Sequence, residues 1–91
     1  MRPLVKSYRT IAFKRLFAAL PPDVKIAARK AYQLWLADPK HPSLHFKPIR
    51  SDIWSIRISL DYRALGVLRG GDIYWHWIGR HDEYQKRIRG S

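Results

Sequence analysis

The side chains that could do chemistry in this chain are cations, imidazoles and a phenol, most of them in its second half. They are His45, Lys47, Arg57, Arg63, His76, Arg80, His81 and Tyr84. Imidazole exchanges protons near neutral pH, and arginine can hold a phosphate through two parallel hydrogen bonds. This set suits cleavage of RNA. The 2′-hydroxyl is the nucleophile, so the protein need only take its proton, neutralise charge on the phosphate and protonate the leaving 5′-oxygen.

Each of these residues also has a plainer interpretation. A lysine or arginine is by default a solvated surface residue. His76 lies between two tryptophans of an expected strand, so we interpret it as structural. Tyr84 could equally be a core residue of the last helix.

Residues for other mechanisms are missing from the sequence. There is no cysteine, which excludes disulfides, thiolate metal sites and a cysteine nucleophile. There is no glycine-rich phosphate loop, and the one glutamate, Glu83, belongs to no carboxylate cluster for Mg²⁺. His41 and His45 are four residues apart, but Pro42 between them disfavours a metal-binding helix. We therefore expect neither a metal nor a cofactor.

The net charge points to a polyanionic partner. Lysine and arginine number 18 against seven acidic residues, which gives +11. The candidate partners are nucleic acid, an anionic membrane or an acidic protein, and a merely basic surface is the alternative. No apolar run approaches the roughly 20 residues that span a bilayer, and nothing resembles a signal peptide. We therefore expect a cytoplasmic protein without a membrane partner.

Period-two alternation predicts a sheet in the second half of the chain. In residues 53–60, the apolar side chains Trp54, Ile56, Ile58 and Leu60 fall on one side, and Ser55, Arg57 and Ser59 fall on the other. Asp61 allows a turn, and residues 62–68 are expected to form a second strand. Residues 69–72 predict a hairpin turn, because paired glycines supply positive φ. A third strand is expected over 73–78, ending at Gly79. The result is an antiparallel meander of three strands.

Helical spacing of apolar residues predicts a first helix over residues 8–20, capped by Ser7 or Thr10. Pro21 and Pro22 end it, and a second helix runs to about residue 37. The short loop predicts an antiparallel helical hairpin. Residues 4–5 could add a brief edge strand, 44–49 are expected to be extended, and 81–88 predict a short C-terminal helix. We expect one α+β domain over residues 1–91, with the helices against one face of the sheet; residues 90–91 are interpreted as a cloning remnant.

The sequence resembles the RelE/ParE superfamily of toxins from bacterial type II toxin–antitoxin systems over nearly its full length. The matching segments are the hairpin ending Leu20-Pro21, the Asp38-Pro39 loop, Leu44-His45-Phe46-Lys47, the Trp-Ser-Ile-Arg-Ile strand, Asp61-Tyr62-Arg63-Ala64-Leu65-Gly66 and Trp77-Ile78-Gly79-Arg80-His81-Asp82-Glu83-Tyr84. The tyrosine-arginine pair and the glycine-x-histidine-x-x-tyrosine ending are the most specific parts. The resemblance implies a RelE-like fold.

The resemblance also implies a choice of targets. RelE-like members enter the ribosomal A site and cut mRNA, whereas ParE-like members poison DNA gyrase and lack the nuclease residues. Both kinds are silenced by an antitoxin, usually acidic, and the pair represses its own promoter. Our first hypothesis is therefore a ribosome-dependent mRNA endonuclease (mRNA interferase), a hydrolase-class enzyme that inhibits translation. The alternatives are a gyrase poison without nuclease activity and a degenerate toxin that binds operator DNA only with its antitoxin.

Residue roles follow from the same resemblance. Arg63 would hold the scissile phosphate, Lys47 would stabilise the transition state or bind RNA, and His81 would be the general acid. Tyr84 would stack on or orient the substrate. Further RNA contacts are expected from His45, Arg57, Arg80 and Lys86.

The general base stays open at this point. Some histidine-using relatives pair the histidine with a carboxylate base, but no glutamate stands at a matching place in this sequence. Asp82 or His45 could substitute, or the ribosome could supply part of the site.

Overall fold

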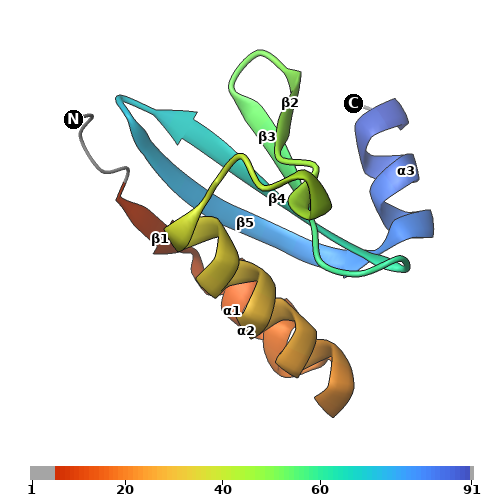
Figure 1. Ribbon diagram of the computed structural model, residues 1–91. Helices are drawn as coiled ribbons and strands as arrows, with labels where there is room; N and C mark the ends of the chain where they lie inside the picture. The colour runs from red at the N-terminus through yellow and green to blue at the C-terminus, as the bar shows by residue number, and fades with distance from the viewer. Residues whose placement is uncertain (1–5, 91) are drawn as a thin grey trace.

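The computed structural model of this chain describes residues 6–90, in which helices lie on both faces of a five-stranded sheet (Figure 1). In chain order the elements are β1 (Ser7–Arg9), α1 (Ile11–Ala18), α2 (Pro22–Ala37), the 3₁₀ turn η1 (Pro42–Leu44), β2 (Lys47–Arg50), β3 (Ile53–Arg57), β4 (Tyr62–Arg69), β5 (Asp72–Arg80) and α3 (His81–Gly90). None of the described helices is both long and apolar enough to cross a membrane.

The sheet has the strand order β1-β5-β4-β3-β2. Its centre, β3-β4-β5, is the predicted antiparallel meander, and the turn before β5 holds Gly70 and Gly71 at φ of 57° and 87°. β2 adds a fourth antiparallel strand beside β3. β1 pairs with β5 in parallel, with Ser7 opposite Ile73. The sheet is therefore mixed, and larger than the predicted three strands.

The first helix begins later than predicted, because residues 7–9 belong to the sheet. The backbone N–H of Ile73 donates to the carbonyl of Lys6 at 2.8 Å, and that of Thr10 donates to the carbonyl of Trp75 at 3.0 Å. These bonds hold the segment extended. Thr10 is the N-cap, as one of the two predictions had it, and its hydroxyl accepts from the N–H of Phe13 at 3.1 Å. The edge strand expected at residues 4–5 lies outside the described residues.

Two extended segments are shorter than predicted. β3 ends at Arg57, and residues 58–61 form the turn into β4, which leaves Leu60 74% exposed at its tip instead of on the apolar face. Before β2, Leu44 ends η1, and His45 has a left-handed backbone with φ of 46°. The chain therefore turns at His45 before the strand begins at Lys47.

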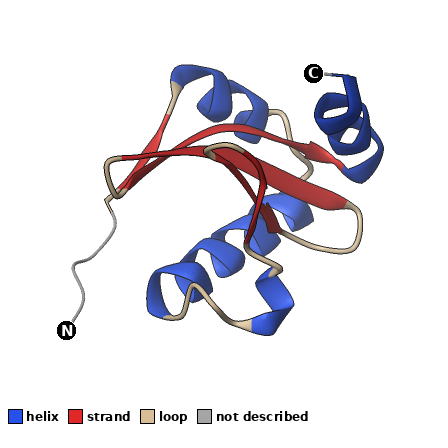
Figure 2. Ribbon diagram, turned by 90° about the horizontal axis from the view of Figure 1, so that it is seen from above, coloured by secondary structure: helices blue, strands red, loops and turns tan. Residues whose placement is uncertain are grey.

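The main core lies between the sheet and the helical hairpin α1–α2, which Figure 1 shows descending and returning below the strands. Its centre is aromatic: the ring of Trp35 meets those of Trp75 and Phe46 edge-on, at 5.5 Å and 5.6 Å between centroids. Figure 2 shows α1 and α2 set apart, under different parts of the sheet. The predicted hairpin is therefore present, but its two helices are splayed.

α3 packs on the other face of the sheet, which differs from the expectation that all helices share one face. The pairing of β4 with β5 is irregular, because Leu65 is opposite Trp77 whereas Gly66 is opposite Trp75. His76 is the extra residue of this bulge, and it turns Trp77 away from the main core. Trp77 and Leu65 form a second cluster with Tyr84 of α3.

Candidate active site

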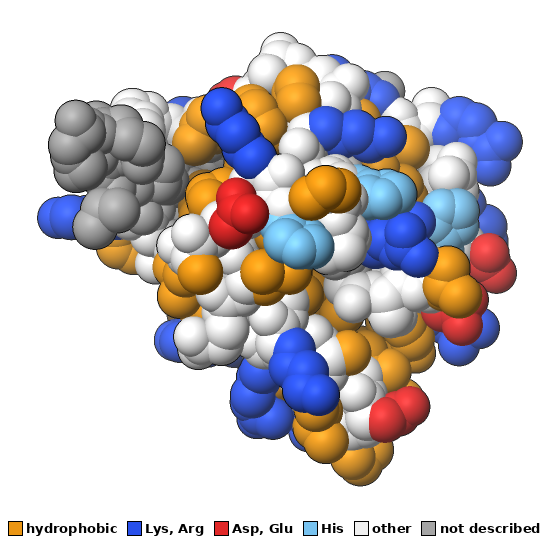
Figure 3. Space-filling view, in the orientation of Figure 1, with side chains coloured by type: hydrophobic (Ala, Val, Ile, Leu, Met, Phe, Trp, Pro, Cys, Tyr) orange, Lys and Arg blue, Asp and Glu red, His pale blue; other side chains and the backbone are white. Residues whose placement is uncertain are grey.

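A pocket of about 230 Å³ lies between α3 and the strands β2, β3 and β4. It is lined by His45, Lys47, Ile49, Ser55, Arg57, Arg63, His81, Tyr84, Gln85 and Ile88. Figure 3 shows histidine and basic side chains lying next to one another on the surface between η1 and α3. None of the lining residues is acidic. An anion bound in this pocket would therefore be stabilised by the positive charges, with no carboxylate in the lining to repel it.

Two arginines form the charged centre of this pocket. Arg57 and Arg63 are directly opposite on β3 and β4. The Arg63 Nη1 atom donates to the carbonyl oxygens of Ser59 and Tyr62 at 2.8 Å and 3.1 Å, which fixes the guanidinium. Burial lowers the pKa of Arg63 from its usual value, and the charge of Arg57 lowers it further. Like charges on paired positions repel, so a bound phosphate would stabilise this arrangement.

A buried tyrosine packs against Arg63. Tyr84 is only 5% exposed, and its hydroxyl donates to Ser55 Oγ at 3.3 Å. The Arg63 Cζ atom lies 5.9 Å from the centroid of the Tyr84 ring. This ring has little free surface on which a base could stack. Tyr84 is therefore placed to hold Arg63, and Ser55 is placed to hold Tyr84.

Two histidines line the same pocket from different elements. A guanidinium carries only donors, so in the 3.4 Å contact between Arg57 Nη1 and His45 Nε2 the imidazole nitrogen is the acceptor. His45 also has the unusual positive φ noted above, which is often seen at functional sites. His81 is the first residue of α3, and its backbone N–H donates to the carbonyl of Asp61 at 2.6 Å. Gln85, one turn later, brings its amide to 3.4 Å from His81 Nε2.

Six of the eight predicted site residues come together in this pocket: His45, Lys47, Arg57, Arg63, His81 and Tyr84. The other two do not line it. The Arg80 guanidinium lies 5.8 Å from the ring centroid of Tyr62, and Lys86 is exposed on α3. Asp82 is exposed and does not line the pocket either. Among residues 6–90, no group of three or more His, Asp or Glu side chains is arranged to hold a metal ion.

Ser55 and Gln85 also line the pocket, although neither is among the predicted site residues. The signal for Ser55 was present, because the alternation put it on the same side of the strand as Arg57. Gln85 follows His81 by four residues, the spacing that places two side chains on one face of a helix. Its contact with His81 depends on where α3 begins, which sequence patterns fix poorly.

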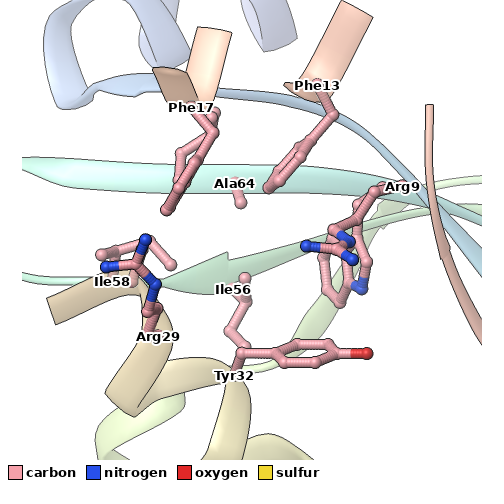
Figure 4. A pocket seen from close by; sticks show the side chains of 11 residues that line it. Arg9, Phe13, Phe17, Arg29, Tyr32, Ile56, Ile58 and Ala64 are labelled. Atoms are coloured by element: carbon pink, nitrogen blue, oxygen red, sulfur yellow. The ribbon is translucent and has the colours of Figure 1, made fainter. Parts of the chain in front are cut away.

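A second hollow, of about 160 Å³, has a different character. This apolar groove lies between the splayed helices (Figure 4), with Phe13 and Phe17 of α1 facing Tyr32 of α2. Strand residues, among them Ile56 and Ala64, form its floor, and Arg9 and Arg29 lie at its rim. The Arg29 Cζ atom is 5.2 Å from the Phe17 ring centroid. Such a groove suits an apolar segment of a partner that also carries negative charge.

Comparison with known proteins gives one family match. Residues 22–86 match the family of ParE-like toxin domains. A search of curated proteins finds no match.

Solved structures share the fold at low sequence identity. The toxin–antitoxin complex RelBE2 of Mycobacterium tuberculosis has a chain 19% identical, with a TM-score of 0.67 over 87% of this chain and 100% of that one. The RelB–RelE complex of Methanococcus jannaschii has a chain 12% identical, with a TM-score of 0.70 over 88% of this chain and 96% of that one. YafQ of Escherichia coli is 9% identical, with a TM-score of 0.70 over 88% and 97%. The predicted RelE-like α+β fold is confirmed.

Proposed function

This chain belongs to the family of ParE-like toxin domains and is a RelE/ParE superfamily toxin of a toxin–antitoxin system, and we propose that it cuts mRNA on the ribosome. The observation that carries the proposal is the pocket itself. Three cations, Lys47, Arg57 and Arg63, meet two imidazoles there, and no carboxylate lines it. Imidazoles beside positive charges are the groups that proton transfer at a phosphate ester requires.

The proposed reaction needs no metal. A base takes the proton of the 2′-hydroxyl, whose oxygen attacks the adjacent phosphorus. The bond from phosphorus to the 5′-oxygen breaks, and that oxygen receives a proton from His81. The products are a 2′,3′-cyclic phosphate and a 5′-hydroxyl. Arg63, with Arg57 and Lys47, neutralises the negative charge that grows on the phosphate oxygens.

His45 is the base that the geometry favours. It lines the same pocket as His81, and its Nε2 atom lies 3.4 Å from Nη1 of Arg57, one of the proposed phosphate-binding arginines. Asp82, the other candidate within the chain, is exposed and outside the pocket. A neutral imidazole as base and a protonated one as acid would give a bell-shaped dependence of cleavage on pH.

Tyr84 is proposed to position rather than stack. Its ring is buried beneath Arg63 and its hydroxyl is bonded to Ser55. Arg80 and Lys86 lie outside the pocket, so any contact they make with RNA would be away from the scissile phosphate.

The partner that silences the toxin is proposed to be an acidic antitoxin. A net charge of +11 attracts acidic segments to the toxin. The apolar groove with Arg9 and Arg29 at its rim offers such a segment a place for apolar side chains as well. Calorimetry at low and high salt would test the role of charge, because contacts that stay solvated weaken as salt rises.

The alternative function is a gyrase poison without nuclease activity. It is favoured by the family match, which is to ParE-like domains. A co-repressor that is not toxic by itself is the third hypothesis, and a harmless wild type would support it.

One experiment separates these functions. Wild type, His81→Ala and the control His76→Gln, whose histidine lies outside the pocket, are each induced briefly in cells, and new mRNA 5′ ends are mapped. Cuts inside translated frames that disappear only in His81→Ala are expected. Growth arrest with intact mRNA and broken DNA in all three would instead establish the gyrase function.

A further inference from the structure

A third hollow, of about 420 Å³, adjoins the active-site pocket on the side of α2 and η1. It is lined by Ala27, Lys30, Ala31, Leu34, Ser43, Leu44, Arg57, Ile58 and Ser59. Arg57 is the residue that lines both hollows. A polymer bound at Arg57 in the active site therefore has a second depression directly beside it.

The end of β3 explains why Arg57 faces both. β2 pairs with β3 only as far as Ser55, which is opposite Lys47. The last residues of β3 therefore have no strand beyond them on that side, and the chain turns away at Ile58. Arg57 is half-buried at this open edge. Arg57 is the residue that the two linings share, so an anion held by it can lie next to either hollow.

The lining of the hollow matches the parts of a nucleotide. Lys30 and Arg57 supply positive charge, which a phosphate needs. Ser43 and Ser59 supply hydroxyls that can bond to the edge of a base. The Ser43 Oγ atom also lies 2.9 Å from His41 Nδ1, which leaves it a lone pair to accept a hydrogen bond from the base. The remaining side chains are aliphatic, such as Leu34, and would cover the apolar face of a base. No acidic residue lines the hollow, so nothing there repels an anion.

We propose that this hollow binds the nucleotide next to the scissile phosphate, with a phosphate between Arg57 and Lys30 and the base against the aliphatic floor. The proposal rests on the nuclease function proposed above. Its lining distinguishes it from the apolar groove between α1 and α2, where phenyl rings dominate and no hydroxyl of serine is present. Because no aromatic ring lines the hollow, the base is recognised through the serine hydroxyls and not by stacking.

The test uses the isolated toxin and RNA oligonucleotides methylated at every 2′-oxygen, which cannot be cut. The probes are a dinucleotide and two tetranucleotides that extend it on the 5′ or the 3′ side. One extension is expected to bind more tightly than the dinucleotide and to shift the NMR signals of Lys30, Ser43 and Ser59. The dinucleotide alone should shift only the protein signals near Arg63 and His81. The extension that produces these shifts gives the direction of the strand.

A matched pair of variants tests the role of charge. Lys30→Ala is expected to weaken binding of the extended probe about fivefold. It should also reduce the slope of log affinity against log salt concentration by about 0.7. Lys14→Ala removes the same charge from an exposed position on α1 that lines none of these hollows, so its effect should be small. Ala27→Leu, which narrows the hollow without changing charge, should weaken only the extended probe.

The outcomes are distinguishable. Equal effects of Lys30→Ala and Lys14→Ala, with the dinucleotide still bound at Arg63, would overturn the subsite and leave the nuclease function standing. Absence of any RNA binding to the wild type would overturn the subsite, whereas the ribosome-dependent nuclease function is decided separately by the mapping of mRNA 5′ ends. Signal shifts around Lys30 that appear only with an added partner protein, and not with RNA, would assign the hollow to protein binding and also overturn the proposal.

Discussion

The two faces of the sheet are made by the same strands but serve opposite purposes. On one face Ile56 and Ala64 are directly paired and lie in the aromatic core under the helical hairpin. The neighbouring pair consists of Arg57, which follows Ile56, and Arg63, which precedes Ala64, and these two form the charged centre of the pocket. Because side chains alternate along a strand, the residues that bury one face determine what the other presents. Core and site are therefore not separable in this protein.

The faces differ most in how they depend on packing. The hairpin face packs four aromatic rings together, of which Trp35 and Trp75 are each only 3% exposed. The α3 face buries a smaller cluster around Trp77 and leaves a pocket lined by three cations. Substitutions of core residues on either face should change stability, whereas substitutions of the charged residues that line the pocket should change activity.

The largest expected effect is that of Trp75→Ala. Trp75 contacts Trp35 and Phe46, so its loss leaves a cavity at the centre of the core. We expect the free energy of unfolding to fall by about 3–5 kcal/mol, measured by denaturant titration. A loss below about 1 kcal/mol would show that the aromatic face does not carry the stability of the sheet.

Arg63→Ala should have the next largest effect, and on cleavage rather than on stability. Removing one group that stabilises charge in a transition state typically slows catalysis about 10²–10³-fold. Unfolding should be little changed, because the repulsion from Arg57 disappears together with the hydrogen bonds to the turn. Arg63→Lys should recover only part of the rate, since lysine lacks the planar fork. The measurement is mRNA cleavage in a translation reaction; full activity of Arg63→Ala would remove Arg63 from the site.

Gly79→Ala tests the packing on the α3 face. A Cβ atom added at Gly79 would lie 2.6 Å and 2.9 Å from the Cζ2 and Cη2 atoms of Trp77. The indole ring is part of a packed cluster, so we expect a loss of about 1–3 kcal/mol in the free energy of unfolding. In a Trp77→Leu background the same change should cost less, which a double-mutant cycle would measure. An equal cost in both backgrounds would mean that the ring is not the obstacle.

Tyr84→Phe separates positioning from stacking. The variant keeps the ring but loses the bond to Ser55, which is worth about 1 kcal/mol, or roughly fivefold in cleavage rate. Ser55→Ala should have a similar effect, and the double variant should be no worse than either. Tyr74→Phe, at an exposed position, is the control. Unchanged cleavage by Tyr84→Phe would favour stacking, because a phenyl ring stacks as well as a phenol.

The smallest expected effect concerns His76 and pH. Burial lowers the pKa of His76, and the charge of Arg87 lowers it further, so the folded protein binds its proton less readily than the unfolded chain. The stability from the neutral imidazole is present above the ordinary histidine pKa near 6.5. It is lost as pH falls below that value, because protons then favour the unfolded state. His76→Gln should flatten this decline in thermal unfolding between about pH 6.5 and 5; an unchanged slope would exclude His76 as its source.

Much of this architecture is readable from alternation and turn chemistry. Residues 53–57 alternate, and the two glycines at 70–71 fix the hairpin, so the centre of the sheet follows from local patterns. The parallel strand β1 does not, because three residues carry little periodicity and are held by bonds to β5 more than 60 positions away. Tertiary pairing overrides the helical pattern there.

The site was predictable in its residue types but not in its full membership. Position on the charged side of β3 indicates both Ser55 and Arg57. Arg80 is next to His81 in sequence, yet it ends β5 over Tyr62 and lies away from the pocket. The face on which α3 packs depends on the bulge at His76, and no residue type in β5 predicts a bulge there. Such details arise from three-dimensional pairing, which periodicity does not encode.

The parallel pairing of β1 with β5 also has a kinetic consequence. Ser7 meets Ile73, so the first described strand stays unpaired until residues some 66 positions later have left the ribosome. At about 5–20 residues per second, that interval is roughly 3–13 s of translation. Contacts so distant in sequence also slow folding itself. During synthesis the nascent chain therefore carries an unfinished sheet, and β1 finds its partner only when the residues of β5 have left the ribosome.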